Sequence, residues 1–276
     1  MLVYHNSIIT ILDGGLGNKF NGLFQGIHLS RILDKNLVIN NLRNHSTDFD
    51  LRLLFDFNFE YIENTLTELD NKLDPSIPLY AHRKDINYKR QVILSNENFK
   101  HQTFAFLTNA IYVPQNELMK CYKHVYITKN IVNKVNEFVS KHDISKNTLG
   151  LHIRASDFPS RLANIKYAEQ FISQNSNKKI FICTDERLVE DQFNHNPNLI
   201  FYPKSHYTEK YNKSIDWNGE IIDNDNRVWN YNAARNEDSM IEAFIEMLIL
   251  SKTNINGNPK SSFLGWARRF GESNLI

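Results

Sequence analysis

The chain opens on an apolar and polar pattern that predicts a strand, a loop, a helix and a second strand. Residues 7–12 (SIITIL) are apolar and β-branched, as in a buried strand, and a glycine-rich loop, DGGLGN at 13–18, follows them. The next apolar residues recur at helical spacing, and residues 37–39 (LVI) form the next predicted strand. The apolar face of that helix is Phe20, Leu23, Phe24, Ile27 and Ile32. Such a unit makes a parallel sheet, with the glycine loop at its carboxyl edge.

The pattern is weaker through residues 45–120, where phenylalanines stand among charged residues. We predict mixed helix and loop there, completing a first domain. Thr128 is then the predicted N-cap of a helix that runs to His142. Its apolar face is Ile131, Val132, Val135, Phe138 and Val139. A second α/β half is expected to start after this helix.

Three further strands are predicted at residues 148–153, 180–183 and 199–202. The first two are followed by polar residues, RASD at 154–157 and TDE at 184–186. Asn236 then begins an amphipathic helix to Leu250, and residues 253–271 are predicted as a polar loop that leads into a basic segment. Because polar residues gather where strands end, the pattern predicts a ligand cleft.

Composition narrows the class of protein. The chain has 276 residues, a net charge of +1, 41% hydrophobic and 23% charged residues, which excludes a collagen, a disordered acidic chain and a strongly basic nucleic-acid binder. The length suits two modest domains or one large one, and we expect two domains with a cleft between them. Cys121 and Cys183 are far apart and lack metal-ligand or CxxC spacing, so we expect reduced thiols in the core.

Targeting signals are not evident in the sequence. No basic segment followed by an apolar one opens the chain, and no stretch approaches the roughly 18 apolar residues of a membrane span. We expect a cytoplasmic protein with no integral membrane segment; peripheral attachment to a membrane stays open.

The glycine loop is the first candidate for ligand binding. Gly15 and Gly17 would let backbone N–H groups approach an anion or a sugar closely, and the Asn18 side chain can donate and accept hydrogen bonds. The loop matches neither GxxxxGK[ST] nor GxGxxG, so a P-loop and a dinucleotide site are rejected. A plain tight turn explains it equally well.

The strand end at His152 and Arg154 is a sharper candidate. In an alternating strand these two side chains point the same way, and a guanidinium there can pair with a diphosphate and stabilise a leaving nucleoside diphosphate. The alternative is an Arg154–Asp157 ion pair with His152 in the core. Ser261 and Ser262 also suit phosphate oxygens, with an ordinary ST-turn as the alternative.

Other charged residues carry weaker signals. Arg268 and Arg269 add positive charge near Ser261, unless they form an exposed basic helix end. Asp223 and Asp225 fit the DxD of metal-dependent glycosyltransferases, but they lie in an Asn/Asp-rich stretch that turn chemistry explains. HExxH and GxSxG are missing, so metal and serine hydrolase chemistry are not expected.

Several segments taken in order resemble the GDP-fucose-dependent O-fucosyltransferase superfamily, which includes α1,2- and α1,6-fucosyltransferases. LHIRASD at 151–157 is similar to the H-x-R-x-x-D strand end of that family, the most diagnostic of its motifs. The opening pattern at 13–43, the FD element near 49–57, IFICTDE at 180–186 and GNPKSSF at 257–263 also resemble it. The likeness extends over some 250 residues.

The resemblance implies a GT-B architecture, an α/β fold with two Rossmann-like domains that face each other across a cleft. Residues 1–125 would form the acceptor-side domain and residues 126–276 the donor-nucleotide domain. The implied activity is an inverting transfer of L-fucose from GDP-fucose to a hydroxyl of a glycan or glycolipid, with no metal and no cofactor. The implied partners are a nucleotide-sugar donor and a glycan or lipid-linked glycan acceptor, and no nucleic acid.

The resemblance also assigns roles to catalytic residues. Arg154 would hold the β-phosphate and stabilise leaving GDP, and Asn18 would lie beside the anomeric carbon or the acceptor. The general base is unassigned: some relatives carry a Glu in the loop, where this chain has Leu16, so Asp157 is the candidate by proximity and Asp13 a weaker one.

Donor-binding roles follow in the same way. Besides Gly15 and Gly17, they would fall to His152 on the phosphate or ribose, Thr184 and Asp185 in the nucleoside pocket, and Ser261, Ser262 and Phe263 on the diphosphate. Several relatives carry a second arginine after the H-x-R arginine, where this chain has Ala155. Two alternatives stay open: another nucleotide-sugar donor, such as GDP-mannose, GDP-rhamnose or a UDP-sugar, and a catalytically inactive relative that binds glycan or nucleotide.

Overall fold

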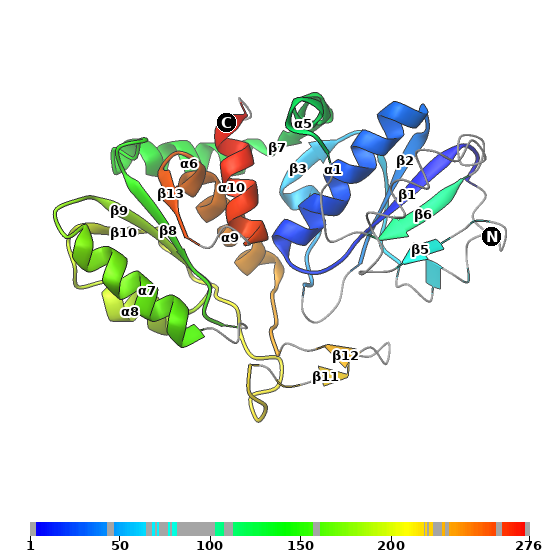
Figure 1. Cartoon of the computed structure of the whole chain (residues 1–276). Coiled ribbons are helices and arrows are strands. Elements are labelled where there is room, and N and C mark those ends of the chain that lie inside the picture. The colour runs from blue at the N-terminus through cyan, green and yellow to red at the C-terminus, as the bar shows by residue number, and fades with distance from the viewer. Residues whose placement is uncertain are drawn as a thin grey trace. The chain divides into compact units, whose positions relative to one another are not determined.

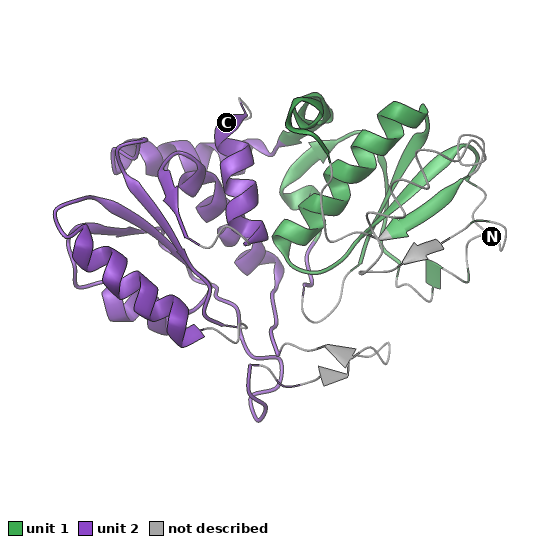
Figure 2. Cartoon of the chain, viewed as in Figure 1, with its two compact units in different colours: residues 1–43, 50–126 green, residues 44–49, 127–276 purple. Residues whose placement is uncertain are grey.

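The computed structural model divides into two compact units, residues 1–43 with 50–126 and residues 44–49 with 127–276 (Figures 1 and 2). The expected boundary at residue 125 lies beside this division, but residues 44–49 group with the second unit, where the Asp48 amide donates to the Arg235 carbonyl at 2.9 Å. The structure describes residues 4–42, 47–64, 68–69, 71, 77, 79–81, 103–107, 113–156, 161–217, 219, 221–222, 228–229, 232–257 and 261–273.

Unit 1 is built on a five-stranded parallel sheet of order β4-β2-β1-β6-β5. Its central strand β1 (Ser7–Leu12) is buried along its whole length and pairs with β2 (Asn36–Asn41) and β6 (Phe104–Leu107). Helix α1 (Leu16–Leu33) connects β1 to β2. The predicted strand, loop, helix and strand are therefore confirmed.

Helix α1 lies close to β1 because small side chains line their contact. Gly26 carries no side chain where a Cβ would come 2.9 Å from the Cβ of Thr10, and the Thr10 hydroxyl donates to the Gly22 carbonyl at 3.0 Å. The helix ends at Asp34, which takes a left-handed conformation with φ 50° and donates its N–H to the Ser30 carbonyl. Ile32 was expected on the buried face, but 44% of it is exposed.

The expectation of mixed helix and loop for residues 45–120 was wrong in part. Three strands of the unit 1 sheet come from this region, namely β4 (Glu60–Ile62), β5 (Leu79–Ala81) and β6. Each has three or four residues, too few to show a period of two, so only pairing along the sheet reveals them. The region also holds η1 (Leu51–Leu53), β3 (Phe55–Phe57) and α5 (Gln115–Cys121).

The chain passes from unit 1 to unit 2 within β7. Strand β7 (Val125–Ile127) follows η2 (Tyr122–His124) and pairs with β3, and α6 (Lys129–Lys141) is the first helix of unit 2. Helix α6 buries Ile131, Val135 and Phe138, so the predicted amphipathic helix is confirmed. Thr128 occupies the predicted N-cap position, although its side chain makes no capping hydrogen bond there.

Unit 2 contains a four-stranded parallel sheet of order β10-β9-β8-β13. Strands β8 (Leu149–Ile153), β9 (Ile180–Thr184) and β10 (Leu199–Phe201) are the predicted ones to within a residue at each end. Strand β13 (Asn254–Asn256) was predicted as loop, because three residues reading NIN give no apolar signal. Strands β11 (Ile221–Ile222) and β12 (Val228–Trp229) form a separate antiparallel pair.

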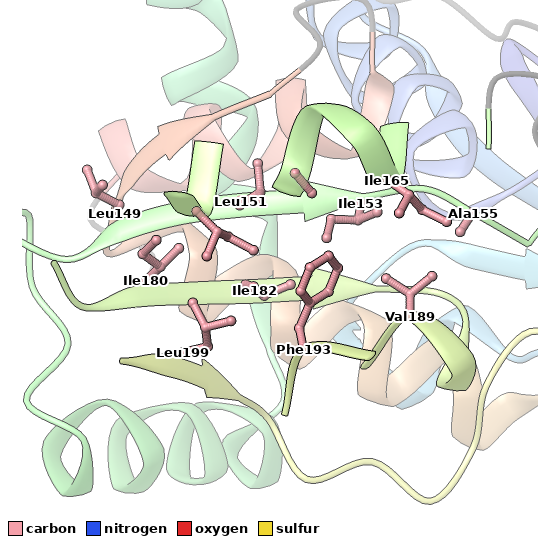
Figure 3. Close-up of a cluster of buried hydrophobic side chains, with 12 residues drawn as sticks. Leu149, Leu151, Ile153, Ala155, Ile165, Ile180, Ile182, Val189, Phe193 and Leu199 are labelled. Carbon is pink, nitrogen blue, oxygen red and sulfur yellow. The ribbon is translucent and has the colours of Figure 1, made fainter. Parts of the chain in front are cut away.

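One face of this sheet is covered by α7 (Arg161–Gln174) and α8 (Arg187–Phe193). Their apolar residues pack with alternate residues of the strands, such as Leu151, Ile153 and Ile182, in the cluster drawn in Figure 3. Because side chains alternate along a strand, those of His152, Phe181 and Cys183 point to the opposite face. That alternation decides which strand residues can reach a ligand.

Helices α6, α9 (Glu237–Ser251) and α10 (Ser262–Glu272) pack on that opposite face. A Cβ at Gly150 of β8 would meet Leu250, near the end of α9, and Thr253 just after it. The centre of the Phe138 ring on α6 lies 6.0 Å from that of the Phe181 ring on β9. Helix α9 was expected to be amphipathic, but all residues from Phe244 to Ser251 are buried because α10, α6 and the sheet surround it. Residues 253–271 were expected to be a polar loop that leads into a basic segment, but the second half of this range forms helix α10.

The two cysteines lie in the core. Cys121 and Cys183 are free and buried, as predicted, and burial raises the pKa of both thiols. Among the described residues, no helix has the length and apolar character that crossing a membrane requires.

Candidate functional site

The candidate site in unit 2 lies where β8, β9 and β13 end, at the carboxyl edge of the parallel sheet. The structure brings together two of the predicted site residues here. The His152 ring of β8 stacks on the Phe263 ring of α10, with ring centroids 4.4 Å apart and planes 14° from parallel. Both rings are half-buried, so this stacked pair has an exposed part that a planar or apolar ligand group can contact.

Asp185 holds the turn that carries Arg154. Its Oδ1 accepts hydrogen bonds from the Ala155 amide at 2.7 Å and the Ser156 amide at 3.2 Å, and its Oδ2 accepts from the Ser156 hydroxyl at 2.7 Å. Asn164 on α7 donates to the Arg154 carbonyl at 2.8 Å. The Asp185 carboxylate therefore positions the turn after β8, and its role in a nucleoside pocket stays a prediction.

Ala155 stands where several members of the fucosyltransferase superfamily carry a second arginine, and its surroundings suit an apolar side chain. The residue is completely buried and its methyl group belongs to the apolar cluster against α7 and α8. The side chain at this position points away from the face of His152, because residues 153 and 155 share one side of the chain. Its lack of charge therefore removes nothing from the face that bears His152.

A buried ion cluster lies beneath the end of β9. Lys204, which follows β10, donates from its Nζ to the Thr184 carbonyl and to Glu246 Oε1 of α9, the latter at 2.9 Å. Only 3% of the Lys204 side chain and 5% of the Glu246 side chain are exposed. Glu190 of α8 lies 3.9 Å from the same ammonium and accepts a hydrogen bond from the Tyr207 hydroxyl at 2.8 Å. The cluster fixes Thr184, the residue before Asp185.

One carboxyl group of this cluster, that of Glu246, has an unusually high pKa, and burial is the main cause. It raises the pKa of Glu246 to about 7, although the Lys204 ammonium opposes the shift. Thr184 is itself buried, and its hydroxyl accepts from the Glu186 amide at 3.3 Å. The predicted Thr184 and Asp185 are thus brought to the sheet edge, where they hydrogen-bond to other residues of the chain.

The N-terminus of α10 adjoins the His152 ring through Phe263. Ser261 is the N-cap, and its hydroxyl accepts from the Leu264 amide at 3.3 Å. Ser262 opens the helix. Such a terminus presents backbone N–H groups and the positive end of the helix dipole, which favour an anion.

Arg268 and Arg269, the arginines expected near Ser261, both lie on α10. Arg268 and Arg269 lie in the second half of an eleven-residue helix, and the Arg269 guanidinium lies 5.2 Å from the centre of the Trp266 ring. A helix rises about 1.5 Å per residue, so Arg268 begins roughly 9 Å along the axis from Ser262. The Arg269 side chain reaches back over the preceding turn, because a Cβ at Gly265 would come 3.0 Å from its guanidinium nitrogen. Positive charge beside Ser261 from these arginines stays a prediction.

The glycine loop in unit 1 has the backbone freedom that the sequence indicated. Gly14 has a φ of 78°, a conformation that residues with a side chain rarely adopt. A Cβ there would come 2.9 Å from the side-chain Nδ2 of Asn18. Gly15 is the N-cap of α1, and a Cβ there would meet nothing within 4 Å. The backbone N–H of Asn18 donates to the Gly15 carbonyl at 2.9 Å. Gly17 is buried in the first turn of the helix.

Lys19 is a residue whose part in this loop the sequence analysis missed. It is fully buried, and its Nζ donates to the Leu42 carbonyl and to Asn41 Oδ1, both at 2.6 Å, and to the Leu12 carbonyl at 3.3 Å. One ammonium thereby joins the ends of β1 and β2 behind the glycine loop. The available signal was a lysine one turn before Leu23, on the apolar side of α1.

Lys204 and Glu246 were also missed, and Glu246 carried a signal. It is an acidic residue amid the apolar run that ends α9, where a charge requires a partner. Nothing in the sequence around Lys204 indicates that it is this partner, because the two residues are 42 positions apart.

Other predicted residues lie outside the described residues. These are Asp157, the candidate base, and the DxD pair Asp223 and Asp225. Asp13 is buried at the end of β1. Within the described ranges, no group of three or more His, Cys, Asp or Glu side chains is placed to hold a metal ion.

Each of the two units has a central parallel sheet, and helices connect neighbouring strands in both. This is the fold class predicted from the sequence: α/β with two Rossmann-like domains, as in GT-B glycosyltransferases. No family model matches the chain, and no curated protein matches its sequence. The fold is similar to that of the solved fucosyltransferase NodZ from Bradyrhizobium, with a TM-score of 0.63, 16% identity, and 96% of this chain and 93% of that one covered.

The same likeness extends to ligand-bound structures. A NodZ alpha-1,6-fucosyltransferase soaked with GDP-fucose has a TM-score of 0.61 at 15% identity, covering 96% of this chain and 92% of the other. One co-crystallised with GDP has a TM-score of 0.59 at 15% identity, with the same coverage. The chain therefore shares the fold of these enzymes over nearly its whole length.

Proposed function

We propose that this protein is a GDP-fucose-dependent fucosyltransferase that transfers L-fucose, with inversion, to a hydroxyl of a glycan or glycolipid. The observation that carries the proposal is the stacking of His152 on Phe263, which joins two motifs 111 residues apart at the end of one sheet. Those motifs are the ones that resemble fucosyltransferases, and the fold is shared with NodZ, whose structures include GDP-fucose and GDP complexes.

In this proposal, the donor diphosphate lies between Arg154 and the N-terminus of α10. The guanidinium supplies a fork of N–H donors, while Ser261, Ser262 and the amides of the first turn supply the rest. As the bond from the anomeric carbon to the diphosphate breaks, negative charge grows on the leaving GDP. Fixed donors aimed at that charge stabilise the transition state more than the ground state.

These groups are proposed to do what a metal does in other glycosyltransferases. Arg154 keeps its charge at every relevant pH, and a helix N-terminus adds about half a positive charge. We therefore propose a metal-independent reaction without a cofactor. The acceptor hydroxyl would lose its proton to a base, for which Asp157 is the candidate and the buried Asp13 the weaker one.

A cytoplasmic location is part of the proposal. Its support is the pair of buried, free thiols at Cys121 and Cys183, which is typical of proteins in reducing compartments.

Nucleotide binding tests the donor. Titration of the purified chain with GDP is expected to raise its melting temperature, because a ligand at 100 times its Kd stabilises by about 2.7 kcal/mol. UDP at the same concentration should leave the melting temperature unchanged, and excess EDTA should not abolish the GDP shift. A shift with UDP alone would favour another sugar nucleotide, and no shift with either would sink the proposal.

The glycine loop provides a second test. Replacing Gly15 with alanine is expected to lower kcat/KM at least about tenfold, because a methyl group would stand where ligand meets backbone. Its φ of −69° suits alanine and its Cβ meets no atom within 4 Å, so the loss of stability should stay below about 1 kcal/mol, the effect of a cap position.

Gly14→Ala is the matched comparison for that test. It forces alanine into a φ of 78° and against Asn18, so it should lose about 1–2 kcal/mol of stability. Wild-type kinetics in Gly15→Ala would contradict the approach of a ligand to this loop.

A further inference from the structure

Unit 1 has a hollow at the end of its sheet opposite the glycine loop. Its volume is about 580 Å³, within the range of small-molecule sites. The lining includes Ser7, Asn36 and Glu60, the first residues of β1, β2 and β4. The glycine loop follows Leu12 at the other end of β1, and a six-residue strand spans about 20 Å. The hollow is therefore separate from the loop.

The lining combines an aromatic ring with polar groups that donate hydrogen bonds and polar groups that accept them. Phe59 is half-exposed and forms one wall, with the Phe57 and His124 rings centred 6.1 and 6.2 Å from it. Asn36, Asn58 and Glu60 are exposed and line the same hollow. Amides both donate and accept hydrogen bonds, and a carboxylate accepts them.

The charges in the hollow nearly balance. Lys35 is buried and donates to Asn6 Oδ1 at 2.9 Å, and burial lowers its pKa. Glu60 lies beside the Tyr4 phenol, and burial together with this carboxylate raises the pKa of Tyr4 to about 12. With one lysine and one glutamate, besides the histidine at position 5, the lining has no excess charge that would select an anion or a cation.

We propose that this hollow binds a neutral saccharide unit. A pyranose has an apolar C–H face, which suits the negative face of the Phe59 ring, and a rim of hydroxyls that each donate and accept hydrogen bonds. The amides of Asn36 and Asn58 and the Glu60 carboxylate, which line the same hollow, can hydrogen-bond such hydroxyls without requiring charge on the ligand. This site goes beyond the proposed transfer of fucose and does not depend on it.

The test measures binding of neutral disaccharides to the full chain by saturation-transfer NMR and calorimetric titration. Lactose, cellobiose and N,N′-diacetylchitobiose are the probes, with inorganic phosphate as the charged comparison. We expect at least one disaccharide to bind, and Phe59→Leu to weaken it about fivefold by removing the flat ring while keeping an apolar side chain. Unchanged melting temperature in Phe59→Leu would show that the fold is kept.

Two controls separate this site from other sites on the chain. Tyr167→Leu removes an exposed ring on α7 in unit 2 and should leave binding unchanged. Arg154→Ala should also leave it unchanged, so loss of transfer and loss of this site are distinguishable. No binding by any disaccharide, binding of phosphate in their place, or binding that is lost in Arg154→Ala and retained in Phe59→Leu would each overturn the proposal.

Discussion

Replacing Arg154 with alanine is expected to lower kcat/KM for fucosyl transfer at least about 100-fold, the effect of removing one donor to developing negative charge. The melting temperature should change by no more than about 2 °C. The reason lies in the backbone around it: Asn164 holds the Arg154 carbonyl, and Asp185 holds the next two amides. None of these bonds uses the guanidinium, so the turn is expected to keep its shape.

Two comparison variants sharpen this test. Arg154→Lys keeps the charge but loses the fork of donors, so it should recover only part of the activity. Arg187→Ala removes an exposed guanidinium from the start of α8, where its ion pair with Asp191 is 4.0 Å long, and should behave as wild type. Near-wild-type transfer by Arg154→Ala would remove Arg154 from the mechanism.

Replacing Lys204 with methionine is expected to lower the free energy of unfolding by about 3–5 kcal/mol, because it leaves Glu246 buried without its partner. The Thr184 carbonyl loses a donor as well. Lys120→Met is the matched control, since Lys120 donates to Glu117 at 2.6 Å on the surface, and its loss should cost less than about 1 kcal/mol. Urea denaturation of both variants measures the difference.

Two further measurements identify the buried charge as the cause. The double variant Lys204→Met with Glu246→Met should be more stable than Lys204→Met alone, because no uncompensated carboxylate remains. If it is no more stable, lost packing and not charge explains the effect.

The pH dependence of Lys204→Met gives the second measurement. The pKa of Glu246 is about 7 in the folded chain, above its ordinary value of 4.5, so its contribution is complete below pH 4.5 and is lost as the pH rises through 7. Without Lys204, which opposes the shift, that pKa rises further and the loss continues to higher pH. The gap in stability between Lys204→Met and the wild type should therefore be wider at pH 8 than at pH 6.

The fold was predictable where apolar runs were long or periodic. Strands β1, β8 and β9 have five or six residues with buried, mostly apolar side chains, and helix α6 keeps one apolar face. Strands β4, β5 and β13 have three residues each, so their identity depends on a neighbouring strand that local sequence does not contain. Helix α9 was misread because its partners on several sides come from distant segments.

The candidate site shows the same division. Motif order suggested His152 and Phe263 as site residues, and the structure stacks their rings. In the structure, the Asp185 oxygens accept hydrogen bonds from the turn after β8. The position of Asp185 after a strand did not indicate that interaction. Lys19, Lys204 and Glu246 were missed because a buried charge is recognised by its partners, which lie on other elements.

Apolar periodicity was enough to predict the central strands, because it is a local property of the chain, and the order of the motifs implied the fold class and the candidate site residues. Which of those residues meet depends on the folded chain. Alternation along β8 turns Ala155 into the apolar cluster and His152 toward α10, and buried ammonium groups find oxygens from segments far away in sequence. Such contacts depend on the packing of whole elements, which no local pattern records.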